Sequence, residues 1–437
     1  MPPITTITLE CGLPLLCETI PGVRSAGVTW LLPAGTAREP AGRLGLGAMW
    51  AELLMRGAGD LDSRAQADAF DALGVSRGTG VETFHVSVTA TLLGSRLAGA
   101  LPLLVDMVRR PRMDGASVEP ARDLCMQSIE SLQDDPPERL MLLLKQLHAP
   151  EPINRSALGT MEGLQAITAD ELLPEWRARA VPAPPTGGSA EGSASAEAGL
   201  LGGGAVLAIA GDVDPAAVAR QLDGLLKGWS GSAQPVAWTP RQRLNPAQPA
   251  YHHEQDKTNQ VHIALAYDGP SERDPSAWPE RLATAVLSQG MGSRLFTEVR
   301  EKRGLCYSVS TSYSTDAAFG RSVAYVGTTP EKAQQSLDVL LAELRRIRTA
   351  EGAVTSEEFA RAVTGMKSKL VMSGESSSAR AAALARDWHR LGRPRSLDEM
   401  ARAIDRLTLE DVNRWLASGP ALSGATIVTL GPAALRA

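Results

Sequence analysis

The stretch SRLFTEVREKRGLCYSVSTSYS, residues 293–314, decides how this chain should fold. Its first part places apolar residues at helical spacing among charged ones and stops at Gly304, which predicts a helix. Its second part begins at Cys306 and alternates serine with larger side chains, which predicts a strand. A helix that turns directly into a strand indicates helices layered on a sheet.

The same order of elements occurs twice along the chain. A hairpin and a buried strand over residues 5–35 precede two helices, a strand over 82–92 and a long helix over 97–110, and residues 260–347 repeat this order from the buried strand onward. Four residues recur at identical spacing and at the same place in that order: Ser117, Glu119, Ala121 and Arg122 become Ser356, Glu358, Ala360 and Arg361. The sequence therefore predicts an internal duplication. The expected fold is α+β, with two similar halves that are each a mixed β-sheet with helices packed on one face.

Two irregular segments divide the chain. Residues 181–204 are poor in large apolar groups and predict a flexible insert. Residues 231–257 are richer in proline and predict the linker between the halves. We therefore expect an N-terminal half over residues 1–230, which includes the insert, and a C-terminal half over residues 258–437.

Composition excludes several classes of function. The 437 residues carry a net charge of −5, which gives no basic field for nucleic acid. No apolar run approaches the length needed to cross a bilayer, so no membrane partner is expected. The N-terminus has neither the basic region nor the apolar run of a secretory signal, and this predicts a cytoplasmic protein.

Cysteine and histidine spacing gives no metal site. The four cysteines have no C-x-x-C spacing and are expected to be small apolar residues, namely Cys11, Cys17, Cys125 and Cys306. His252 and His253 form the only histidine pair. Because they lie among polar residues with no partner four positions away, an exposed strand edge is a better interpretation than a metal site.

These features together resemble a known family over nearly the whole chain. Residues 9–40 resemble the opening hairpin and first strand of the inverzincin metallopeptidases, which include pitrilysin, insulin-degrading enzyme and the mitochondrial processing peptidase. Residues 293–314 resemble the family's second-half signature and are the most specific match. Residues 397–416 and 425–432 resemble its closing helix and strand.

The resemblance also reveals a lost metal site. Active members carry H-x-x-E-H on the helix that corresponds to GLGAMWAELLMRGAGD, residues 45–60. The two His positions appear here as Ala48 and Glu52, and the Glu that polarises water appears as Ala51. The third zinc ligand falls at Ala121. A catalytic zinc needs three protein ligands, so the resemblance implies no cofactor in this chain.

A second feature of the family survives in the C-terminal half. In the resembled family an Arg and a Tyr seven positions apart reach toward the substrate at the zinc, and they match Arg300 and Tyr307. A guanidinium and a phenol can hydrogen-bond a peptide carbonyl or the oxyanion that develops on it. Without the resemblance, both would be taken as ordinary surface or half-buried residues.

The leading hypothesis is therefore a non-catalytic subunit of a heterodimeric zinc metallopeptidase. Bacterial members of this length often pair a chain that keeps the zinc motif with one that keeps only the Arg and Tyr. The expected partners are a homologous zinc-bearing subunit, which holds the zinc, and an unfolded peptide substrate. Two alternatives stay open: a structural or assembly core subunit without peptidase role, and a stand-alone peptide-binding protein. Neither the cleavage specificity nor the choice between peptide turnover and precursor processing follows from the sequence.

Overall fold

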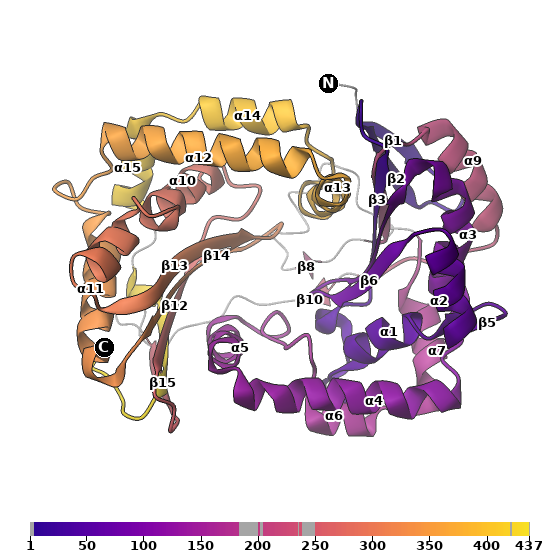
Figure 1. Cartoon of the computed structure of the whole chain (residues 1–437), viewed down its shortest axis with the longest axis horizontal. Helices are drawn as coiled ribbons and strands as arrows, with labels where there is room; N and C mark the ends of the chain where they lie inside the picture. Colours follow the sequence, from indigo (N-terminus) through magenta and orange to yellow (C-terminus); the bar gives the residue numbers. More distant parts are fainter. Residues whose placement is uncertain are drawn as a thin grey trace. The chain divides into compact units, whose positions relative to one another are not determined.

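The computed structural model describes residues 4–182, 200–201, 204–234, 236–237, 250–419 and 422–436. They form two compact units (Figure 1). Unit 1 comprises Met1–Ser131, Glu151–Thr239 and Met372–Ser396, and unit 2 comprises Leu132–Pro150, Pro240–Val371 and Leu397–Ala437. Residues 132–150, from the first half of the sequence, thus belong to unit 2, and residues 372–396, from the second half, belong to unit 1.

Unit 1 is built on a six-stranded sheet. Its strands, in spatial order, are β1 (Thr5–Thr8), β2 (Pro14–Thr19), β9 (Val206–Gly211), β3 (Ser25–Leu32), β7 (Val86–Leu93) and β6 (Ser76–Val81). Strands β2 and β9 are parallel and the other neighbours are antiparallel. The helices of the unit are α1 (Leu46–Leu54), α2 (Ser63–Ala72), α3 (Leu97–Arg109), α4 (Gly115–Glu130), α6 (Met161–Ala166), α7 (Ala169–Arg179), α9 (Pro215–Leu225) and α13 (Ser377–Leu391).

The core of unit 1 lies between one face of this sheet and the helices that surround α1. Alternate residues of β3, such as Val28 and Trp30, point into this core, where Trp50 of α1 is fully buried. Its indole N–H donates to the Leu172 carbonyl oxygen at 3.0 Å, so the large ring is buried without an unpaired donor.

Helix α13, from late in the sequence, covers the other face of the unit 1 sheet (Figure 1). Gly27 permits the close approach, because a Cβ there would lie 2.5 Å from the Ser377 backbone. The Arg380 guanidinium pairs with the Glu18 carboxylate at 2.6 Å, with both side chains buried. Removal of either partner would leave a buried charge unpaired, so this contact fixes where α13 docks.

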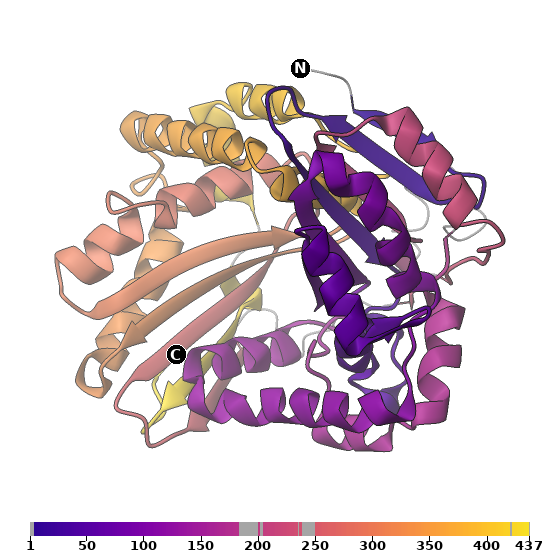
Figure 2. The same cartoon turned by 45° about the vertical axis from the view of Figure 1, so that its right-hand side comes forward.

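Unit 2 is built on a five-stranded sheet, whose long antiparallel strands β13 and β14 run side by side in Figure 2. The spatial order is β11 (Ala250–Gln255), β15 (Thr426–Gly431), β12 (Val261–Gly269), β14 (Gly320–Thr328) and β13 (Cys306–Thr315). The helices of the unit are α5 (Pro136–His148), α10 (Ala277–Ser288), α11 (Ala333–Arg346), α12 (Ser356–Gly374), α14 (Leu397–Asp405) and α15 (Leu409–Ser418), and most of α12 belongs here.

One face of the unit 2 sheet forms the main core with α10, α11 and α15, and α5 covers part of the other face. Leu140 and Leu144 of α5 pack on Ala264 and Val428. The buried imidazole of His148 lies 3.1 Å from the Thr426 hydroxyl and 3.1 Å from the Asp268 carboxylate. These contacts hold the C-terminal end of α5 on the sheet.

The two sheets have the same topology, which confirms the predicted fold class of two similar α+β halves. The order β2-β9-β3-β7-β6 in unit 1 matches β11-β15-β12-β14-β13 in unit 2, and β2/β9 and β11/β15 are the parallel pairs. The structure adds one helix on the second face of each sheet, which the sequence pattern did not predict. Both helices come from the opposite half of the sequence, so local periodicity carried no information about their docking.

Several sequence predictions concern residues outside the described part of the chain. Most of the predicted insert 181–204 lies there, as do residues 235 and 238–249 of the predicted linker, whereas residues 250–255 of the linker form β11. The His252–His253 pair lies on β11, at an edge of its sheet. Within the described ranges, no helix is long and apolar enough to span a membrane.

Candidate functional site

Helix α1, the counterpart of the zinc helix, is fixed at its N-terminus by Glu39. The carboxylate of Glu39 is buried and accepts hydrogen bonds from the backbone N–H groups of Gly45 at 2.9 Å and Gly47 at 2.7 Å. These amides have no partner within the helix, and the positive end of the helix dipole favours the negative charge. Burial raises the pKa of Glu39, while the hydrogen bonds from Gly47 and Gly45 oppose that rise.

The degenerate zinc positions lie on two helices in contact. Ala48, Ala51 and Glu52 lie on α1, and Ala121 lies on α4, which packs against α1. Ala48 and Ala121 are buried. The Glu52 side chain is 43% exposed and lies 3.9 Å from the guanidinium of Arg56, which follows the end of α1. The structure thus brings together the two helices that the sequence assigned to the lost site.

The residues present at these positions do not fit a catalytic zinc. Only Glu52 has a ligand atom, whereas zinc needs three protein ligands. Burial, and secondarily Glu52, raises the pKa of the neighbouring Cys125 thiol to about 11, so it is protonated near pH 7. In the described parts of the chain, no three His, Cys, Asp or Glu side chains gather into a group that could hold a metal ion.

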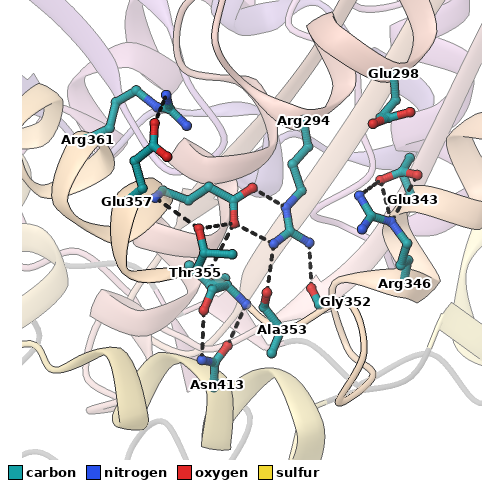
Figure 3. Close-up of polar contacts among 12 residues, drawn as sticks. Arg294, Glu298, Glu343, Arg346, Gly352, Ala353, Thr355, Glu357, Arg361 and Asn413 are labelled. Atoms are coloured by element: carbon teal, nitrogen blue, oxygen red, sulfur yellow. Dashed lines mark hydrogen bonds and ion pairs between the residues drawn. The ribbon is translucent and has the colours of Figure 1, made fainter. Parts of the chain in front are cut away.

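In unit 2, Arg294 anchors the segment that carries Arg300. Figure 3 shows the Arg294 guanidinium pointing into a polar cluster. Arg294 donates to both Glu358 carboxylate oxygens at 2.6 Å and to the carbonyl oxygens of Gly352 at 2.6 Å and Ala353 at 2.9 Å. The Glu358 carboxylate also accepts from the Thr355 amide at 3.0 Å, as in a capping box. One buried cation therefore joins the start of α12, the preceding loop and the signature stretch.

The predicted helix after Arg294 is a π-helical turn, η5 (Phe296–Glu301). The Lys302 N–H donates to the Thr297 carbonyl oxygen at 2.9 Å, a hydrogen bond across five residues. Arg300 is exposed on this turn, with its guanidinium carbon 5.0 Å from the centre of the Phe296 ring. Among the described residues Arg300 is in no ion pair, in contrast to Arg303, which pairs with Glu298 at 2.7 Å.

Tyr307 lies just beyond η5, at an irregular point of β13. Cys306 pairs with Thr328 and Ser308 pairs with Gly327, so Tyr307 is an extra residue in a β-bulge. The side chain is 45% exposed, and its hydroxyl donates to the Gln260 amide oxygen. Burial of the ring raises the pKa of Tyr307, and the hydroxyl stays protonated at neutral pH. Because η5 packs against β13, Arg300 and Tyr307 belong to one end of unit 2.

Sequence analysis missed the residues that support these positions. Glu39 and Arg294 are both buried charged residues; they lie within the stretches 9–40 and 293–314, but neither was assigned a role from the sequence. Thr355 and Glu358 have the spacing of a capping box, and this pair was the available signal for Arg294, because a buried cap carboxylate needs a cation. The burial itself depends on tertiary packing and is not visible in one sequence.

The chain is similar in sequence to known peptidase-family proteins. Residues 202–366 match the family model described as the Peptidase M16 inactive domain. An uncharacterized zinc protease of Mycobacterium tuberculosis is 28% identical over 423 residues, covering 93% of this chain and 88% of that protein. A second uncharacterized zinc protease, from Streptomyces coelicolor, is 28% identical over 412 residues and covers 93% of this chain and 84% of its own length.

Solved structures share the fold. A structure described as the peptidase M16 inactive domain from Pseudomonas fluorescens superposes with a TM-score of 0.82 at 20% identity, covering 100% of this chain and 99% of that one. A chain of Complex III2 from Candida albicans gives a TM-score of 0.79 at 16% identity, and the match covers 98% of this chain and 96% of that one.

Fold and site together define a peptidase-like chain whose zinc positions lack zinc ligands. Residues 202–366 match the M16 inactive domain, and over nearly its whole length the chain is similar to zinc proteases and shares the fold of a solved M16 inactive domain.

Proposed function

We propose that this chain is the non-catalytic subunit of a heterodimeric zinc peptidase, and that it supplies Arg300 and Tyr307 in trans to the substrate at the partner's zinc. The single observation that carries the proposal is the exposure of these two side chains at one end of unit 2. Both are hydrogen-bond donors near neutral pH, and Arg300 is not committed to an ion pair within the described residues.

The chemistry of the two side chains suits a peptide bond under attack. A hydroxyl and a guanidinium can donate to the scissile carbonyl, and both donations strengthen as negative charge develops on its oxygen. In the partner, the bound zinc would supply the polarised water. The substrate is an unfolded peptide, bound in extended form by strand addition at a sheet edge of the partner. The pair would act in the cytoplasm.

The test is cleavage of a quenched fluorogenic peptide by this chain alone, by a neighbouring H-x-x-E-H chain alone, and by the mixture. We expect activity in the mixture only. Arg300→Ala and Tyr307→Phe should each lower turnover by the assembled pair about a hundredfold, the magnitude typical of one lost oxyanion donor. The matched control is Arg303→Ala, because Arg303 is a nearby arginine already paired with Glu298.

A fully active neighbour that is indifferent to this chain would contradict the proposal, as would unchanged turnover by both variants. Size-exclusion chromatography of each mixture separates lost chemistry from lost assembly, since neither variant should dissociate the pair.

A structural role is the second candidate. The observation that favours it is the likeness to a chain of Complex III2, which shows that this fold occurs within a large assembly. On this hypothesis the chain would co-purify in a complex whose stability depends on it, and Arg300→Ala would change nothing. A stand-alone peptide-binding protein would instead bind labelled unfolded peptide by itself without cleavage.

A further inference from the structure

The bulge in β13 aims the Tyr307 ring at one particular place on β14. Gly327 of β14 has no side chain there, and a Cβ built on it would lie 3.2 Å from the Tyr307 hydroxyl. The same point is 3.0 Å from the hydroxyl of Tyr325, two residues earlier on β14. Two phenol hydroxyls therefore converge over Gly327, at most about 6 Å apart, which is a distance that one shared hydrogen-bonding atom can span.

Tyr325 is itself held by a buried histidine. Its hydroxyl lies 2.8 Å from Nδ1 of His262 on β12, and the two rings stack with their centres 6.2 Å apart. Burial lowers the pKa of His262, and Arg139 lowers it further against the opposing charges of Asp135 and Asp256. With Nδ1 protonated, neutral His262 donates to the Tyr325 oxygen and leaves the Tyr325 proton for the space above Gly327.

We infer that Tyr325, backed by His262, forms with Tyr307 a two-hydroxyl subsite above Gly327, where a backbone carbonyl oxygen of the substrate peptide replaces the Gln260 amide oxygen as the acceptor of the Tyr307 proton. This inference rests on the proposed function, to which it adds a second substrate-contacting tyrosine.

The surroundings favour an uncharged acceptor. Ser310, directly opposite Tyr325 in the strand register, and Ser312 are exposed on the same face. The cation nearest His262 is already committed, because Arg139 pairs with Glu254 at 3.0 Å and with Asp256. Burial raises the pKa of Tyr325 to about 12, with a smaller contribution from Tyr307, so both phenols are neutral donors. A peptide carbonyl fits two neutral donors on a serine-rich face better than a charged side chain does.

The experiment is a double-mutant cycle in the assembled pair. Tyr325→Phe should lower kcat/KM about tenfold in the presence of Tyr307, and less than twofold in the Tyr307→Phe background, since the two hydroxyls serve one ligand atom. Gly327→Ala should cost about tenfold, because a methyl group would stand between the hydroxyls. Ser312→Ala is the matched control on the same face and should change kcat/KM less than twofold. Unchanged melting temperatures of the variants exclude a merely structural effect.

The outcomes separate this inference from the proposed function. If Tyr307→Phe is impaired and Tyr325→Phe is either inert or fully additive with it, the shared subsite is wrong and the proposed function stands. If Tyr307→Phe does not change turnover, the proposed function fails. The subsite is then tested separately, by measuring the binding of a labelled unstructured peptide to the isolated chain by fluorescence anisotropy. Fivefold weaker binding by both Phe variants then supports the subsite, and unchanged binding overturns it.

Discussion

Helix α1 and the turn η5 lie in corresponding segments of the two units, between β3 and β6 or between β12 and β13, but they differ in geometry and burial. By chain order α1 corresponds to α10, the first helix of its segment, and η5 corresponds to α2, the second; α2 and η5 each lead to a glycine with positive φ, Gly74 at 66° or Gly304 at 58°. Almost every residue of α1 is buried, whereas only Val299 is buried in η5.

The comparison teaches which part of a duplicated scaffold can lose chemistry and stay folded. Regular α-helical geometry and fully buried residues such as Met49, Trp50 and Leu53 make α1 part of the core, worth about 2 kcal/mol for each large side chain. The η5 turn is π-helical, with Arg300 and Glu301 exposed at its end, and such turns are frequent at functional sites. Core packing therefore holds α1 in place without metal ligands, while the Arg294 anchor supports η5.

Removal of the Arg294 anchor should have the largest effect on the stability of unit 2 and on η5. Arg294→Met would leave the Glu358 carboxylate and two loop carbonyls without their cation. We expect a loss of about 3 kcal/mol in the free energy of unfolding, at the low end for a buried pair because Glu358 is 18% exposed. Urea denaturation measures this loss. Turnover by the assembled pair should fall more than the unfolded fraction explains, because η5 carries Arg300; a fall equal to that fraction would contradict the anchoring role.

The matching change in unit 1 is Glu39→Ala. It removes the acceptor for the Gly45 and Gly47 amides at the start of α1 and should cost about 2 kcal/mol, the upper range for loss of a helix cap. Denaturant unfolding again gives the loss. In contrast to Arg294→Met, the activity of the pair per folded molecule should not change. A drop in that specific activity would show that α1 still shapes the working site.

Lowering the pH tests the Arg294 anchor through the ionisation of Glu358. Burial alone would raise its pKa, but the hydrogen bond from Arg294 and that from the Thr355 amide outweigh it and hold the pKa below 4.5. Folding thus favours the ionised form, and its stabilising contribution is present above the ordinary glutamate pKa and is lost as pH falls through the folded value. The difference in unfolding free energy between wild type and Glu358→Gln should therefore shrink between pH 6 and pH 3. A constant difference would show that the carboxylate is not ionised in the fold.

The repeated topology could be predicted from the sequence because hydrophobic period and glycine stops are local signals. The docking of α13 could not, because the Arg380–Glu18 pair joins residues 362 positions apart. The π-helical form of η5 was also missed, since its residues have ordinary helical spacing. For the site, Arg300 and Tyr307 came from a resemblance rather than from spacing, and their roles remain predictions. The supporting contacts of Gln260, Tyr325 and His262 depend on a bulge that a strand pattern does not reveal.

The smallest expected effect belongs to Glu52, the one ligand-type side chain left on α1. Its contact with Arg56 is long and its side chain is 43% exposed, so Glu52→Ala should change the free energy of unfolding by less than about 0.5 kcal/mol. Thermal unfolding in the presence and absence of zinc measures this directly, and neither the variant nor the ion should shift the melting temperature of the isolated chain by more than about 2 °C. A zinc-dependent rise in the wild type that vanishes in Glu52→Ala would mean that α1 still contributes to a metal site. If neither Glu52→Ala nor zinc shifts the melting temperature, α1 makes no contribution to the chemistry. The functional residues would then be those on and beside η5, where Arg300→Ala is expected to lower turnover about a hundredfold.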